Sequence, residues 1–204
     1  AMLAAKLETW EEARVIFAFH VVGTIMEIFK TGAGSWIYPE ESFLRIAGVP
    51  LFSGFMYAAV GSYLARVWRI FEFRFERFPP LWLQALLAAG VYANSFTHHY
   101  MPDMRLGLFA FSVIIYAPCF VYFRPDRQER FMPLAIGLLL VALFIWFAEN
   151  LGTFARAWVY PSQDKSWHPV SLDKLGSWYL LMIISFVLVA ALHHGVGRQK
   201  GQGA

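Results

Sequence analysis

The stretch Glu27–Pro39, EIFKTGAGSWIYP, sets the architecture of the chain, because it recurs without a gap as Glu149–Pro161, ENLGTFARAWVYP. Each copy starts with a carboxylate at the end of one apolar run and leads into another. The identical pairs are Glu27/Glu149, Thr31/Thr153, Ala33/Ala155, Trp36/Trp158, Tyr38/Tyr160 and Pro39/Pro161. This pattern predicts an internal repeat with units of about 13–75 and 132–196. An ionisable group in such a place is costly in lipid and indicates a specific role.

Composition indicates a polytopic membrane protein, since 58% of the 204 residues are hydrophobic, 15% are charged and the apolar residues fall in long runs. A helix needs about 20 apolar residues to cross a bilayer. Six segments meet this length: Ala13–Lys30, Gly48–Ile70, Leu81–His98, Leu106–Phe123, Met132–Thr153 and Leu175–His194. The sequence therefore predicts an all-α bundle of about six transmembrane helices in one domain, 1–204, because the links are short.

The distribution of Lys and Arg predicts the orientation. Eleven of the 17 lie on the side of the N-terminus, which by the positive-inside rule places both termini in the cytoplasm. Four spans separate the copies, so they are predicted to be parallel repeats, with both copies facing outward from a bacterial cytoplasmic membrane. The opening AMLAAKL is also what truncation of a longer helix would leave. Segments that mix Arg with aromatic residues favour anchoring at the bilayer surface over nucleic-acid binding.

A polar stripe marks the first predicted span. His20, Thr24 and Glu27 follow the i, i+4, i+7 spacing of one helix face. Two interpretations stay open for Glu27 and its counterpart Glu149: they are a general acid and base, with His20 setting the protonation of a partner, or they are structural groups that fasten loop ends.

A possible metal site follows the third predicted span. His98, His99 and Asp103 lie within six residues, and imidazole with carboxylate suits zinc, iron or manganese. Glu27, Glu149 or His20 would complete the ligand shell. Because adjacent histidines point to different helix faces, the alternative is a pair of hydrogen-bonded histidines with no metal.

Aromatic and amide side chains gather on the same outward side. An aromatic belt at the bilayer surface explains them, and so does a slot for a flat or polyunsaturated lipid, with isoprenoids as the expected substrate class. The expected substrate-binding residues are Trp36, Tyr38, Asn94, Asn150, Trp158 and Tyr160.

Five stretches carry a family resemblance: Phe19–Pro39, Arg45–Arg69, Asn94–Asp103, Leu143–Pro161 and Lys174–Val189. Together they closely resemble the YoaT-like bacterial integral membrane family, a domain of unknown function, over nearly the whole chain. Members are usually longer at the N-terminus, which agrees with a truncated start. The resemblance implies a membrane protein and supplies no activity.

A Glu followed by a tryptophan-tyrosine turn and a GVPL helix start is more distantly similar to lycopene cyclases and carotenoid hydratases. That resemblance implies that Glu27 and Glu149 protonate a polyene double bond, although the acidic pair of the cyclases is absent after GVP. We therefore expect a membrane-embedded acid/base enzyme of hydratase, cyclase or isomerase type that acts on an isoprenoid or other unsaturated lipid. The alternatives are a small-solute or proton transporter or binding protein, and a metal-dependent membrane hydrolase.

Overall fold

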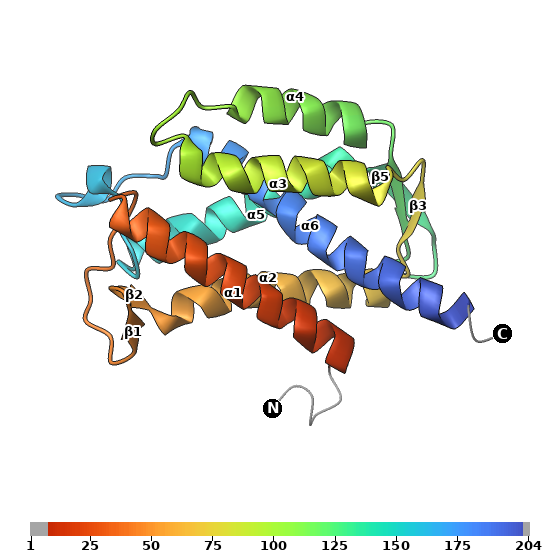
Figure 1. Cartoon of the computed structure of the whole chain (residues 1–204), viewed down its shortest axis with the longest axis horizontal. Coiled ribbons are helices and arrows are strands. Elements are labelled where there is room, and N and C mark those ends of the chain that lie inside the picture. The colour runs from red at the N-terminus through yellow and green to blue at the C-terminus, as the bar shows by residue number, and fades with distance from the viewer. Residues whose placement is uncertain (1–7, 202–204) are drawn as a thin grey trace.

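The computed structural model describes residues 8–201 as a bundle of helices arranged around the last one (Figure 1). The helix α6 contacts each of the other five helices, while α1 packs mainly on α2. The bounds are α1 Trp10–Gly32, α2 Leu51–Ile70, α3 Leu81–Thr97, α4 Arg105–Tyr116, α5 Leu134–Phe154 and α6 Leu172–Gly201. The predicted helical class is confirmed.

Among the described residues, three helices are long and apolar enough to cross a membrane, at Glu12–Gly32, Leu134–Phe154 and Leu172–Ala191. The helix α4 is apolar but has only 12 residues. The predicted span Leu106–Phe123 was therefore too long: the helix ends at Tyr116, and Phe120–Phe123 form the strand β4. The expected number of six spans stays a prediction.

Short antiparallel sheets close the two ends of the bundle (Figure 1). At one end, β3 Arg74–Glu76 and β5 Arg130–Pro133 flank β4. At the other end, β1 Arg45–Ile46 and β2 Val49–Pro50 form a hairpin whose turn needs Gly48, with a φ of 81°. The segments rich in Arg and aromatic residues thus form strands at the end away from this hairpin.

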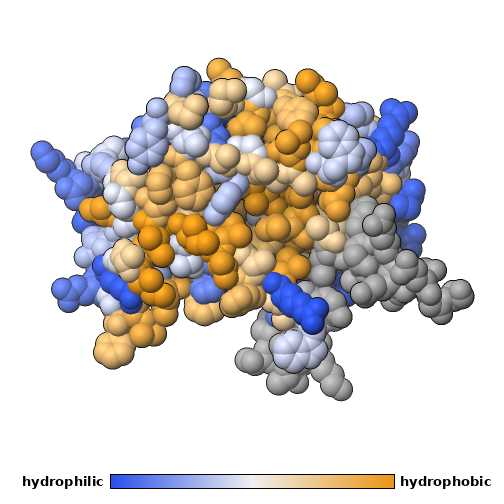
Figure 2. Space-filling view, in the orientation of Figure 1, coloured by the Kyte–Doolittle hydropathy of each residue, from blue (hydrophilic) through white to orange (hydrophobic). Residues whose placement is uncertain are grey.

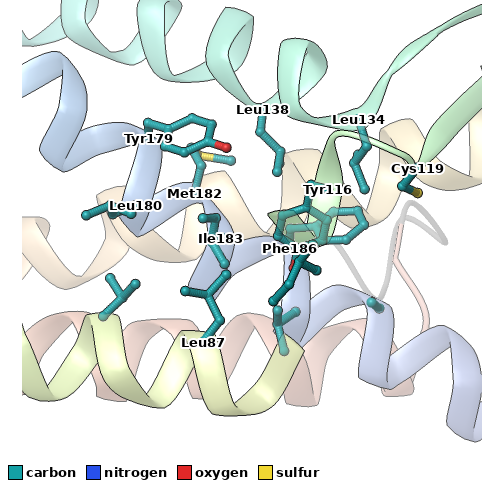
Figure 3. Packing of buried hydrophobic residues seen from close by; sticks show 14 of the residues in the cluster. Leu87, Tyr116, Cys119, Leu134, Leu138, Tyr179, Leu180, Met182, Ile183 and Phe186 are labelled. Atoms are coloured by element: carbon teal, nitrogen blue, oxygen red, sulfur yellow. The ribbon is translucent and has the colours of Figure 1, made fainter. Parts of the chain in front are cut away.

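Apolar packing fills the bundle interior. Tyr116, Ile183 and Phe186 lie at its centre (Figure 3). The buried polar groups there are satisfied, because Tyr116 donates to Gln84 Oε1 at 3.2 Å and Gln84 Nε2 donates to the Pro79 carbonyl at 2.7 Å. On the face shown in Figure 2, hydrophobic residues cover the middle and hydrophilic residues gather toward the two ends, as a lipid environment requires.

Glycines allow α1 and α2 to approach closely. A Cβ atom added at Gly54 would overlap Thr24 Oγ1 and lie 2.6 Å from the ring of His20. A Cβ at Gly23 would lie 2.5 Å from the Tyr57 ring. Small residues at such an interface let helices pack by van der Waals contact, which is the main attraction available to them in lipid.

We expect Gly54→Ala to lower the free energy of unfolding by about 1 to 3 kcal/mol, because the added methyl forces the two helices apart. The measurement is thermal unfolding in a neutral detergent. The control is Gly107→Ala on α4, where an added Cβ meets no atom within 4 Å. Equal stability of the two variants would contradict the close packing of α1 on α2.

Candidate functional site

The two copies of the recurring stretch meet at the hairpin end of the bundle. Ile37 and Val159 pair as an antiparallel β-bridge, with N···O distances of 3.0 and 2.9 Å. Next to this bridge, the rings of Trp36 and Tyr160 touch edge to face with centroids 6.3 Å apart. The loops of the two copies therefore lie side by side at this end.

Glu27 is buried, with 3% of its surface exposed, and three donors surround its carboxyl group. Trp36 Nε1 and Tyr38 Oη donate to Oε2 at 2.9 and 2.6 Å. Tyr57 Oη, from α2, donates to Oε1 at 2.9 Å. The carboxyl group thus fastens the loop after α1 to the bundle and links it to α2.

Glu149 is equally buried and accepts two hydrogen bonds. Tyr160 Oη donates to Oε1, and Trp178 Nε1 from α6 donates to Oε2 at 2.6 Å. The tyrosine follows its carboxylate by eleven residues, as Tyr38 follows Glu27. The tryptophans differ, because the ring of Trp158 packs against Gly152 instead of reaching the carboxylate.

The two loop tyrosines are held as hydrogen-bond donors. Burial, and then the negative charge of the adjacent carboxylate, raise the pKa of Tyr38 and of Tyr160 well above the ordinary value. Both phenols therefore keep their protons throughout the physiological range. Lys174 Nζ lies 4.3 Å from the centroid of the Tyr160 ring and 5.8 Å from that of Trp36, so it covers this aromatic pair as a cation–π partner.

The side-chain amino group of Lys30 lies beside His98 and His99. Lys30 Nζ lies 3.4 Å from His98 Nε2 and 3.2 Å from His99 Nε2, and the two imidazole centroids are 4.1 Å apart. Burial, followed by the charges of Lys30 and His98, lowers the pKa of His99. Within the described part of the chain, no group of three or more His, Cys, Asp or Glu side chains is arranged to hold a metal.

The carboxylate of Asp103 accepts hydrogen bonds from Asn94 and Arg105. Its Oδ1 accepts from Asn94 Nδ2 at 3.1 Å and from the Arg105 backbone N–H at 3.0 Å, and Arg105 Nε donates to its Oδ2. Burial acts to raise the pKa of Asp103, but these hydrogen bonds and the charge of Arg105 bring it below the ordinary value. Asp103 and the two histidines thus have different hydrogen-bond partners, and a metal site formed by His98, His99 and Asp103 stays a prediction.

The two predicted substrate-binding amides organise loops. Asn94 Oδ1 accepts from the Met104 N–H at 3.0 Å and so helps to fix the start of α4. Asn150 Nδ2 donates to the Trp146 carbonyl at 2.8 Å, and its Oδ1 accepts from the Val170 N–H at 2.9 Å. The hydrogen bonds of these two amide side chains do not include Glu27 or Glu149.

His20 lies apart from the carboxylates with which it was predicted to act. Its ring stacks on Phe55 at a centroid distance of 4.7 Å, and it lies beside Gly54. Its Nδ1 is buried without a hydrogen-bond partner, and the groups that donate to Glu27 do not include it. His20, Thr24 and Glu27 all lie on α1, as expected, but the hydrogen bonds to the Glu27 carboxyl group come from the loop and from α2.

An apolar pocket of about 40 Å³ lies between α1, α2, α3, α5 and α6. Its lining includes Gly23, Val60 and Ile145, together with Tyr57 and Trp178. Those two residues are also donors to Glu27 and to Glu149. The sequence offered little sign of Tyr57, which stands in an apolar helix outside both copies of the recurring stretch.

Two solved structures share the fold. A cross-linked trimer of MvINS superimposes with a TM-score of 0.65, at 12% identity, over 91% of this chain and 95% of that one. MvINS itself, an Insig homologue from Mycobacterium vanbaalenii, gives a TM-score of 0.64, also at 12% identity, over 89% and 93%. At this identity the likeness concerns the fold alone, and it agrees with a membrane protein.

Sequence relatives define the family. The chain is 44% identical over 191 residues to the uncharacterized protein YoaT of Bacillus subtilis (strain 168), covering 94% of this chain and 72% of that protein. Residues 1–186 match the family described as protein of unknown function, DUF817. The resemblance to a YoaT-like family is confirmed, whereas that to carotenoid enzymes stays a prediction. The chain is a member of the DUF817 family.

Proposed function

We propose that this membrane protein takes up a hydrocarbon segment of a lipid in the pocket between its helices. The pocket carries this proposal, because its walls are almost wholly apolar, while two of its lining residues, Tyr57 and Trp178, donate hydrogen bonds to buried carboxylates. Ligand sites commonly combine apolar walls with a few placed polar groups. A free volume of about 40 Å³ suits part of a slender chain better than a ring system.

A second candidate is an acid/base enzyme acting on an unsaturated or isoprenoid lipid. One observation favours it: Tyr57 is among the residues that line the pocket, and its hydroxyl donates to Glu27 at 2.9 Å, so a single side chain links the pocket to a carboxyl group. A positioned group of this kind contributes about 10²- to 10⁴-fold to a proton transfer. Glu27 would act through Tyr57, because Glu27 itself does not line the pocket.

Glu149 has a different place in this proposal. Its partner among the residues that line the pocket is Trp178, whose indole N–H can donate a hydrogen bond but cannot accept one. Glu149 is therefore assigned to holding the loop and α6 in position. The transport alternative has less support, since the pocket walls lack a row of polar groups.

The proposed setting keeps several sequence predictions. We place the chain as one domain in the bacterial cytoplasmic membrane, with its carboxylate end outward and its helix–loop–helix units as parallel repeats. The matched tyrosine–carboxylate contacts and the pairing of Ile37 with Val159 support the repeat.

We expect Val60→Phe to fill the pocket and to lower the amount of lipid that co-purifies with the protein severalfold, because the larger ring takes the place of the hydrocarbon. Native mass spectrometry after purification in a neutral detergent measures the bound lipid. The matched control is Val113→Phe on α4, which is 53% exposed and lies outside the pocket. Undiminished lipid in a folded Val60→Phe protein would refute binding in this pocket.

For the enzyme candidate, we expect Tyr57→Phe and Glu27→Gln each to lower product formation about 100-fold or more, because each removes one half of the proton-bearing pair. The measurement is the lipid composition of cells with the protein, without it, and with each variant. Tyr63→Phe is the control, since it removes a hydroxyl from the same helix at a side chain that is 55% exposed and lies outside the pocket. Identical lipids in cells with and without the protein would eliminate the enzyme and leave lipid binding.

A further inference from the structure

We infer that Lys30 and Lys174, with His98 and His99, form a binding site for a phosphate-type oxyanion. This site goes beyond the lipid-chain pocket, because none of its four residues lines that pocket. It lies at the same end of the bundle as the two carboxylates. The inference rests on buried positive charge that has no carboxylate partner.

Lys30 is the centre of the site. Only 8% of its surface is exposed, and its side-chain neighbours are the Nε2 atoms of His98 and His99. His98 Nδ1 lies 2.8 Å from the Asn94 carbonyl, which can only accept, so Nδ1 carries the proton and Nε2 accepts from Lys30. An ammonium group has three protons, and two imidazoles use two of them.

The acids at this end are occupied by other donors. Glu27 and Glu149 accept from tyrosine and tryptophan, and Asp103 accepts from Asn94 and Arg105. Among the side chains that the structure describes, no carboxylate lies within 4.0 Å of any lysine nitrogen. A buried ammonium without an anion is costly, and a bound anion would remove that cost.

Further cations come from two other helices. A chain of contacts runs from His98 through Asn94 and Asp103 to Arg105, whose guanidinium reaches Ser177 Oγ on α6 at 3.5 Å. Lys174, also on α6, has its Nζ 5.8 Å from the ring centroid of Trp36, and the adjacent Ser35 N–H donates to the Lys30 carbonyl at 2.9 Å, so both lysines lie at the same loop. Two ammonium groups without a carboxylate partner suit an oxyanion with several acceptor oxygens, which a phosphate group provides.

The test is a titration of the purified protein, in a neutral maltoside detergent, with inorganic phosphate and separately with dihexanoyl phosphatidic acid, followed by calorimetry. Dihexanoylglycerol, which lacks the phosphate, is the ligand control. We expect saturable binding of one or both phosphate ligands and a dissociation constant raised about tenfold or more by Lys30→Met and by Lys174→Met, since each removes a charge-assisted donor.

The control variant is Lys165→Met, because Lys165 is exposed in the loop before α6 and should leave the affinity unchanged. Binding of phosphatidic acid alone identifies a lipid headgroup, and binding of inorganic phosphate identifies a soluble anion. If Lys30→Met fails to fold, Lys174→Met and His99→Gln carry the test. The inference is overturned if neither phosphate ligand binds, or if folded Lys30→Met and Lys174→Met proteins bind as tightly as the original chain.

Discussion

The hydrogen bond between a buried carboxylate and the tyrosine eleven residues after it holds the site end of this protein together. It occurs twice, as Glu27 with Tyr38 and Glu149 with Tyr160. Each bond returns the loop to the helix that it left, and the β-bridge of Ile37 with Val159 then joins the two loops. Because a buried carboxylate without donors would cost several kcal/mol, each loop has one favoured path. This path places Trp36 where it donates to Glu27, and it places the rings of Trp36 and Tyr160 beside Lys174.

Hydrophobic runs predicted the helices well because lipid and core impose the same requirement along a whole segment. They failed at Leu106–Phe123, where the residues are uniformly apolar but the chain turns after Tyr116 and pairs as β4 with β3 and β5. Hydropathy measures which residues leave water, and a short helix followed by a partly buried strand satisfies it equally. One partner, β5, follows within the same link, but the other, β3, lies more than 40 residues earlier, and hydropathy alone indicates neither pairing.

The candidate site was predicted in part, for a similar reason. The repeated spacing identified Glu27 and Glu149 with Tyr38 and Tyr160, since all four lie within the recurring stretch. Tyr57 of α2 was missed as a partner of Glu27, and Lys30 was missed as the partner of His98 and His99 although it lies within the recurring stretch. For His20, helical spacing shows which residues share a face but not which neighbour that face meets. Gly54 of α2 lies against His20, and the predicted role of His20 stays a prediction.

The two carboxylates have similar burial and similar tyrosine donors, yet their remaining partners differ in chemistry. The pocket residue bonded to Glu27 is Tyr57, whose hydroxyl can both donate and accept a hydrogen bond. The pocket residue bonded to Glu149 is Trp178, whose indole N–H can only donate. The recurring stretch thus supplies one structural contact twice, and α2 and α6 supply the difference between the copies. In the enzyme candidate proposed above, Glu27 acts through Tyr57, and the contact of Glu149 with Trp178 joins α5 to α6.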